Sequence, residues 1–104
     1  MARFDVYRNP DKTVQASIPF FLDIQSDHIK GLQTRLVVPL WRADELVSGA
    51  EQLNPAFVVA GQSVVMDTPS LGAVPMFVLT KKVDSLASEQ IQIQNAIDTI
   101  FGSY

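Results

Sequence analysis

The chain has 104 residues and a formal net charge of −3 at pH 7, and it contains no cysteine. This length predicts a single domain over residues 1–104, and the missing cysteines exclude disulfides, thiolate metal sites and cysteine nucleophiles. The acidic balance disfavours direct, high-affinity binding to phosphate backbones, because nucleic-acid-binding domains usually carry a basic patch.

Short β-strands are predicted through the first half of the chain, where apolar residues alternate with polar ones or form short apolar runs. These segments lie at residues 4–6, 18–24 and 34–40. Because proline has no N–H to donate within a sheet, we expect Pro19 at the entry or edge of its strand. For the same reason we expect Pro39 at an edge or a bulge.

Three further strands are predicted in the second half of the chain, at residues 56–60, 63–67 and 73–80. Glycine reaches positive φ without strain, so Gly61-Gln62 is predicted as the tight turn between the first two of them. Between the third strand of the chain and this hairpin, residues 43–46 are predicted to form one short helical turn.

The last part of the chain changes to a helical period. Its apolar residues are spaced as on one face of an α-helix: Leu86, Ile93, Ala96, Ile97, Ile100 and Phe101. Asp84 or Ser85 is predicted to cap the start of this helix, and Gly102 to end it. Strands followed by one helix predict an antiparallel sheet with the helix packed on it, with Leu86, Ile93 and Ile97 in the core.

Candidate catalytic groups are few. His28 is the single histidine and is interpreted as a solvated loop residue, and the carboxylates form no catalytic or metal-binding motif. Four arginines could supply the cations of an RNA-cleaving site but are interpreted as ordinary surface residues: Arg3, Arg8, Arg35 and Arg42. We therefore expect no catalytic residue, no metal site and no cofactor, and a protein that binds other proteins rather than an enzyme.

The compartment is also predicted from what the sequence lacks. No apolar stretch approaches the roughly 18 residues needed to span a bilayer, and the N-terminus has no apolar run of signal-peptide length. We expect a complete, soluble, cytoplasmic protein that does not contact a membrane.

Five segments together resemble the CcdB family of toxins in their order and spacing. They are RFDVYRN at the N-terminus, FFLDIQSDHI (20–29), TRLVVPL (34–40), AVPMFVL (73–79) and NAIDTIF (95–101). The resemblance implies a mainly β fold with one C-terminal α-helix. That fold is a twisted antiparallel sheet of the SH3-like, barrel-type CcdB/MazF kind with a small second sheet, assembled as a homodimer.

The resemblance also implies a function, that of the toxin of a type II toxin–antitoxin system. Such a toxin binds the A subunit of DNA gyrase and traps the gyrase–DNA cleavage complex. A cognate CcdA-like antitoxin neutralises it, and the two proteins together repress their operon. Nucleic acid is then contacted only indirectly, through the antitoxin or gyrase.

The residues that match the family's gyrase-binding positions follow the QSD turn and end the helix: His28, Ile29, Asp98, Phe101, Gly102, Ser103 and Tyr104. Ile29 and Phe101 keep the family's character. His28 stands where the family has an aliphatic residue and Asp98 where it has an amide, and the chain ends Gly-Ser-Tyr in place of Trp-Gly-Ile.

The resemblance places antitoxin contacts in the first loop and in the 41–46 stretch, at Arg8, Asn9, Val14, Trp41, Arg42 and Leu46. Two alternatives stay open. One is a MazF-type mRNA endoribonuclease, since a fold does not fix a function. The other is a chromosomal homologue that binds antitoxin but no longer poisons gyrase.

Overall fold

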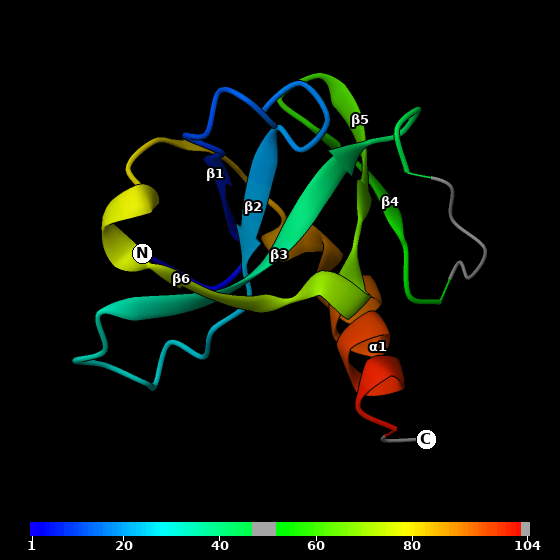
Figure 1. Ribbon diagram of the computed structural model, residues 1–104. Helices are drawn as coiled ribbons and strands as arrows, with labels where there is room; N and C mark the ends of the chain where they lie inside the picture. Colours follow the sequence, from blue (N-terminus) through cyan, green and yellow to red (C-terminus); the bar gives the residue numbers. More distant parts are fainter. Residues whose placement is uncertain (47–51, 103–104) are drawn as a thin grey trace.

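Seven antiparallel strands and one α-helix make up the part of the chain that the computed structural model describes, residues 1–46 and 52–102 (Figure 1). The strands are β1 (Asp5–Arg8), β2 (Phe20–Asp23), β3 (Thr34–Arg42), β4 (Ala56–Val59), β5 (Gln62–Met66), β6 (Gly72–Pro75) and β7 (Lys82–Ser85). Three 3₁₀ turns, η1 (Thr68–Ser70), η2 (Met76–Val78) and η3 (Ala87–Glu89), precede the helix α1 (Gln90–Ile100). The mainly β fold with one C-terminal helix is thus confirmed.

The strands form one sheet in the order β4-β5-β3-β2-β1-β7. The long strand β3 is central: its start, Thr34–Val37, pairs with β6, and its end, Leu40–Arg42, pairs with β5. The expected small second sheet is therefore not separate, because β6 is joined to the main sheet through β3.

Pro39 lies inside this central strand, so its predicted place at an edge or bulge is wrong. On one side it pairs with Phe21 of β2. On the other side it falls between the residues that pair with β6 and those that pair with β5. Its carbonyl there accepts the N–H of Asp67 at 3.0 Å. The missing N–H is tolerated because neither strand needs it at this position. Pro19, by contrast, lies just before β2, as predicted.

The main hydrophobic core fills one face of the curled sheet, against α1. Ile93, Ala96 and Ile97 of the helix are buried there together with Leu86, as the helical spacing predicted. They contact the inward-facing side chains of the strands, among them Leu22, Val38, Leu40, Val59, Val64 and Met66. No helix within the described ranges is long and apolar enough to cross a membrane.

The opposite face of the sheet carries a second, smaller core. Tyr7 and Val37 are buried there with Leu79, the residue that follows η2. Beside this core lie three buried charged side chains, Asp5, Asp23 and Arg35. Because the sheet is covered on both faces, charged residues within its strands become buried as well.

Two predicted elements of the C-terminal third are wrong in extent. The expected strand 73–80 ends at Pro75 and continues as η2, after which β7 forms where no strand was predicted. Asp84 and Ser85 consequently lie in β7, and α1 begins only at Gln90. Pairing of β7 with β1 outweighs the local capping preference, although the Ser85 hydroxyl still accepts the N–H of Ala87 ahead of η3. Gly102, with φ of +71°, lies just after the helix, as predicted.

A short helical turn was predicted at residues 43–46. The chain makes one hydrogen-bonded turn there, which does not continue into a helix. The N–H of Glu45 donates to the carbonyl of Arg42 at 2.9 Å, and β3 runs two residues further than predicted before this turn.

The hairpin turn between β4 and β5 is one residue earlier than predicted. Val59 pairs with Gln62, which leaves Ala60 and Gly61 as the two turn residues, with φ of +50° and +79°. These angles match a type I′ turn, whose right-handed twist suits a hairpin. Ala60 occupies a conformation that costs an L-residue about 1–2 kcal/mol.

Replacing Ala60 with glycine is expected to raise the free energy of unfolding by about 0.5–1 kcal/mol, since the relieved strain exceeds the added freedom of the unfolded chain. Urea denaturation measures this change. Ala56→Gly, in the extended backbone of β4, is the matched control and should lower the free energy of unfolding. If both variants changed the free energy of unfolding in the same direction, backbone strain at Ala60 would be contradicted.

The sheet curls into a half-barrel (Figure 1), and its edge strands β4 and β7 contact each other. Asp84 of β7 joins them at one end. Its Oδ2 accepts the N–H of Ala60 at 2.9 Å, and its Oδ1 accepts the N–H of Ser85 at 2.8 Å. The hydrogen bond from Ala60, followed by the one from Ser85, holds the pKa of the Asp84 carboxyl below its usual range.

Asp84→Asn is expected to lower the free energy of unfolding by about 0.5–1 kcal/mol at pH 7, a small effect because the carboxylate is partly solvated. Since its pKa is lower in the folded chain, the contribution is present above the ordinary value of 3.8 and is lost as pH falls through the folded pKa. Urea denaturation of both proteins from pH 7 to pH 3 should therefore show the difference shrinking toward acid pH. A difference that does not change with pH would contradict this role.

Candidate functional site

The turn that follows β2 and the helix α1 are joined by the side chain of Arg3. Its Nε donates to the carbonyl of Ile24 at 3.2 Å, and its Nη2 donates to Oε1 of Gln94 at 2.6 Å. The backbone N–H of Arg3 donates to Oδ1 of Asp27 at 2.8 Å. On the helix, Nε2 of Gln94 donates in turn to Oδ1 of Asp98 at 2.9 Å. A continuous polar chain thus links two segments that lie about 70 residues apart in the sequence.

The neighbour of Arg3, Phe4, has an unusual backbone conformation. Phe4 is buried and has φ of +75°, a conformation that is rare for a bulky residue. Its N–H donates to the carbonyl of Asp23 at 2.7 Å, and its carbonyl accepts the N–H of Leu86 at 2.8 Å. These two bonds hold the start of the chain between β2 and β7, and the guanidinium of Arg3 lies 4.8 Å from the Phe4 ring centre.

Apolar side chains are displayed at both ends of this polar chain. Ile29, in the turn after β2, is 47% exposed, and Phe101, just past α1, is 67% exposed. His28 is exposed beside Ile29, and Asp98 is partly buried. We call the surface formed by His28, Ile29, Asp98, Phe101 and Gly102 the turn–helix surface. The two remaining residues predicted for this site, Ser103 and Tyr104, lie outside the described residues.

A second surface forms where the first loop, residues 9–19, meets the end of β3. The N–H of Arg42 donates to the carbonyl of Ser17 at 2.8 Å, and Nη1 of Arg42 lies 3.5 Å from the carbonyl oxygen of Ala16. Nη2 of Arg42 also pairs with Oδ2 of Asp44 at 3.0 Å. The first loop therefore contacts the 41–46 stretch through Ala16 and Ser17, which follow the loop residues expected to contact an antitoxin.

The residues predicted for this second surface differ in exposure. Arg8 and Val14 are exposed, whereas Trp41 and Leu46 are partly buried, with Nε1 of Trp41 donating to Asp67 at 3.0 Å. Asn9 is buried: its Nδ2 donates to the carbonyl of Ile18 at 2.9 Å, and its Oδ1 accepts the N–H of Asp11 at 3.0 Å. Asn9 therefore shapes the loop from within.

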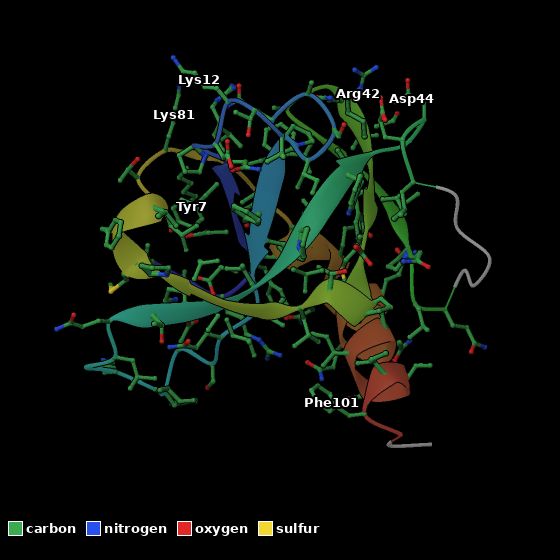
Figure 2. The ribbon with its side chains drawn as sticks, viewed as in Figure 1. Tyr7, Lys12, Arg42, Asp44, Lys81 and Phe101 are labelled. Carbon is green, nitrogen blue, oxygen red and sulfur yellow. The ribbon has the colours of Figure 1, made fainter. Side chains whose placement is uncertain are left out.

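The two surfaces lie at opposite ends of the molecule. Figure 2 shows Arg42 and Asp44 at one end and Phe101 at the other. The molecule measures 35 Å along its longest axis. A partner that covers both surfaces of one protomer must therefore be long.

The four arginines do not lie as the sequence suggested. Arg35 is buried, and its Nε and Nη2 approach Oδ2 of Asp23 at 2.9 and 2.7 Å. Arg3 is held in the polar chain, and Arg42 pairs with Asp44. Their interpretation as ordinary surface residues is therefore wrong for Arg35. Three of the four guanidinium groups are already engaged within the protein, which leaves them poorly placed to bind RNA phosphates.

Asp23 is fully buried beneath its partner. Burial raises the pKa of the Asp23 carboxyl, and the hydrogen bond from Arg35 offsets part of that rise. Asp5 lies nearby and pairs with Nζ of Lys82 at 3.2 Å. Burial, followed by the charge of Asp5, also raises the pKa of Tyr7. This cluster supports the sheet and lies on its smaller core.

Sequence reasoning missed the role of Arg3, Asp27 and Gln94 in positioning the turn–helix surface. Arg3 and Gln94 are 91 residues apart, and neither belongs to a motif. The local signal available was weak: an arginine beside an aromatic residue at a strand start, and polar residues on a helix face.

Arg3→Met keeps a long side chain but removes its hydrogen bonds to Ile24 and Gln94. We expect the free energy of unfolding to fall by about 1–3 kcal/mol and the amide resonances of Gln94 and Asp98 to shift. Urea denaturation and NMR spectroscopy measure these effects. The control is Arg8→Met, on an exposed side chain, which should change the free energy of unfolding by less than about 0.5 kcal/mol. Unchanged helix resonances in Arg3→Met would contradict the polar chain.

Comparison with models of known protein families gives a match over nearly the whole chain. A family model described as CcdB protein matches residues 3–102. The match covers every strand and the helix, and it includes both surfaces described above.

Proposed function

Since the chain belongs to the CcdB family, whose members are toxins of toxin–antitoxin modules, we propose that it binds the A subunit of DNA gyrase and traps the gyrase–DNA cleavage complex. The turn–helix surface is the proposed contact. In this proposal the protein acts by binding and carries out no covalent step of its own.

The polar chain through Arg3 is the observation that carries this proposal. It joins Asp27, two residues before the exposed Ile29, to Gln94 and Asp98 of the helix that ends just before the exposed Phe101. Apolar and aromatic anchors that are rigid before binding lose little conformational entropy on binding and supply much of the energy of a protein interface. A loosely held turn would not support such an interface.

The second surface is the proposed contact for a CcdA-like antitoxin, through Arg8, Val14, Trp41, Arg42 and Leu46, with Asn9 shaping the loop. An extended antitoxin segment of about ten residues would span the longest extent of the molecule, 35 Å, and could reach from there to the turn–helix surface. A flexible antitoxin tail could supply such a segment. Repression of the operon by the toxin–antitoxin complex, a cytoplasmic location and a homodimer complete the proposal.

The proposal is tested with purified chain, gyrase and supercoiled DNA. We expect calorimetry to detect binding to the isolated A subunit of gyrase, and the supercoiling reaction to accumulate cleaved DNA when the chain is added. Folded protein that neither binds this gyrase subunit nor causes cleavage, and whose overexpression is harmless, would instead indicate a homologue that keeps only antitoxin binding. RNA cleavage that disappears in His28→Ala would indicate the endoribonuclease.

A further inference from the structure

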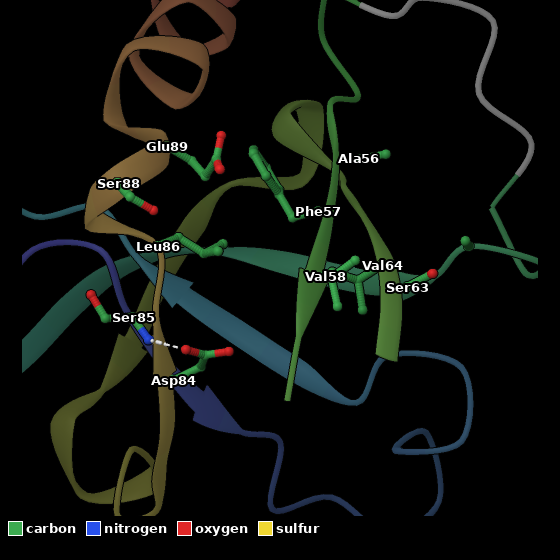
Figure 3. A pocket seen from close by; sticks show the side chains of 11 residues that line it. Ala56, Phe57, Val58, Ser63, Val64, Asp84, Ser85, Leu86, Ser88 and Glu89 are labelled. Carbon is green, nitrogen blue, oxygen red and sulfur yellow. Dashed lines mark hydrogen bonds between the residues drawn. The ribbon is translucent and has the colours of Figure 1, made fainter. Parts of the chain in front are cut away.

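A groove lies at the seam of the half-barrel, between its two edge strands. It has a volume of about 450 Å³ and is bounded on one side by β4 and β5 and on the other by β7 and η3 (Figure 3). Phe57 and Val64 lie at its base with Leu86, Val58 lies beside them on β4, and Glu89 points toward Phe57 from η3. We propose that this groove binds an extended segment of a partner protein that adds to the free edge of β4 and places a lysine or arginine beside Glu89.

The edge of β4 is open to pairing. Within the described residues, β4 pairs with β5 alone, and β4 and β7 are the two ends of the strand order. Val59 and Phe57 pair with Gln62 and Val64 next to the two-residue turn. Alternation along the strand then directs the backbone groups of Ala56 and Val58 away from β5. These groups are available to an added strand.

β4 also lacks the features that normally protect an edge strand. Residues Ala56–Val59 include no charge and no proline, their register with β5 has no bulge, and Val58 is 64% exposed. The other edge strand, β7, has Lys82 and Asp84 and a register shift against β1. Since a flat apolar edge invites unwanted pairing, an open β4 beside a protected β7 points to an edge that a partner covers.

The charge of the groove indicates the chemistry of the occupant. Among the described residues that line it, Asp84 and Glu89 carry charge and none is a lysine or an arginine. Hydrogen bonds from Ala60 and Ser85 stabilise the Asp84 carboxylate and lower its pKa. A basic side chain on the added strand would therefore meet Glu89 within the negative field of both carboxylates, whereas an acidic one would be repelled.

The shape of the groove limits where the segment lies. The bond between Ala60 and Asp84 closes the groove at the hairpin end. An added strand therefore fits toward the other end of the groove, along Ala56 and Val58 and beside Glu89. A segment of about three to five residues matches the length of β4 at the spacing of a strand.

The test uses the full chain, labelled with nitrogen-15, and an acetylated five-residue peptide of alternating valine and threonine with a central lysine. Two matched peptides carry norleucine in place of lysine, or N-methyl groups on the backbone amides that would face β4. We expect the lysine peptide to shift the amide resonances of Ala56, Val58 and Ser85–Glu89. N-methylation should weaken binding about tenfold, because main-chain hydrogen bonds supply the affinity.

Protein variants test the two halves of the proposal separately. Glu89→Gln should weaken the lysine peptide about threefold and leave the norleucine peptide unchanged. Val58→Lys should abolish the shifts, whereas Ile91→Lys, at a 76% exposed site on α1, should not. Thermal melts establish that each variant is folded. The proposal would be overturned if the N-methylated peptide bound as tightly as the lysine peptide, or if the peptide shifted resonances elsewhere in the protein. It would also be overturned if the β4 resonances changed only with protein concentration, because the occupant would then be a second copy of the chain. Neither the gyrase nor the antitoxin assignment enters this test.

Discussion

Replacing Arg35 with methionine is expected to lower the free energy of unfolding by about 3–5 kcal/mol, a larger loss than for any other substitution proposed for this chain. The substitution leaves Asp23, which is fully buried, without the guanidinium that approaches its Oδ2 at 2.9 and 2.7 Å. A buried carboxylate that loses its cation remains an uncompensated charge, because bulk water cannot solvate it there. Chemical denaturation with urea, at several pH values, measures the change.

The pH dependence of this variant follows from the direction of the Asp23 pKa. Burial already raises that pKa in the native protein, and loss of Arg35 removes an interaction that lowers it. An acid with a raised folded-state pKa makes the folded state less stable as pH rises through that pKa. The free energy of unfolding that Arg35→Met loses relative to the native protein should therefore be larger at pH 8 than at pH 5.

Two controls separate the buried pair from ion pairs in general. Arg42→Met removes the exposed pair with Asp44 and should change the free energy of unfolding by less than about 1 kcal/mol. The double variant Asp23→Leu with Arg35→Met should be more stable than Arg35→Met alone, because no charge is then left unpaired. If Arg35→Met and Arg42→Met lower the free energy of unfolding by the same amount, the buried pair contributes no more to stability than the exposed one.

The strands with clear alternation and the helical face could be predicted from sequence because each depends on local spacing. Ile93, Ala96 and Ile97 lie where the period of 3.6 residues placed them. β7 could not be predicted, because Lys82–Ser85 becomes a strand only through pairing with β1 at the other end of the chain. Pro39 was misplaced for a related reason. The sheet tolerates its missing N–H because Pro39 falls between the part of β3 that pairs with β6 and the part that pairs with β5. Arg35 was misjudged because burial by a second core is a tertiary property.

The candidate site was predictable only in part, and by resemblance rather than by local pattern. His28, Ile29 and Phe101 are exposed, which suits a binding surface. The side chain that relates the two segments, Arg3, had no signal that would separate it from other arginines. Its role depends on the positive φ of Phe4 and on a helix residue 91 positions away. Contacts of this kind require the fold before they can be inferred.

Phe101→Ala is expected to weaken binding to the A subunit of gyrase by about 30-fold or more, equivalent to about 2 kcal/mol, and to reduce cleaved DNA in the supercoiling reaction in proportion. Phe101 is 67% exposed and follows the last residue of α1, so its truncation should cost the fold less than about 1 kcal/mol. An effect on binding without an effect on stability is what distinguishes an interface anchor from a core residue. Calorimetry and urea denaturation provide the two measurements.

The matched control is Ile91→Ala, which truncates a 76% exposed residue in the first turn of the same helix, at the end away from Phe101. It should change gyrase affinity by less than about threefold, since scattered exposed apolar residues carry little binding energy on their own. Ile29→Ala should weaken binding as Phe101→Ala does, because the polar chain through Arg3 presents both side chains to one partner. Equal, small effects of Ile91→Ala and Phe101→Ala, with gyrase binding intact, would move the gyrase contact away from the turn–helix surface. Loss in Phe101→Ala alone would restrict that contact to the end of the helix.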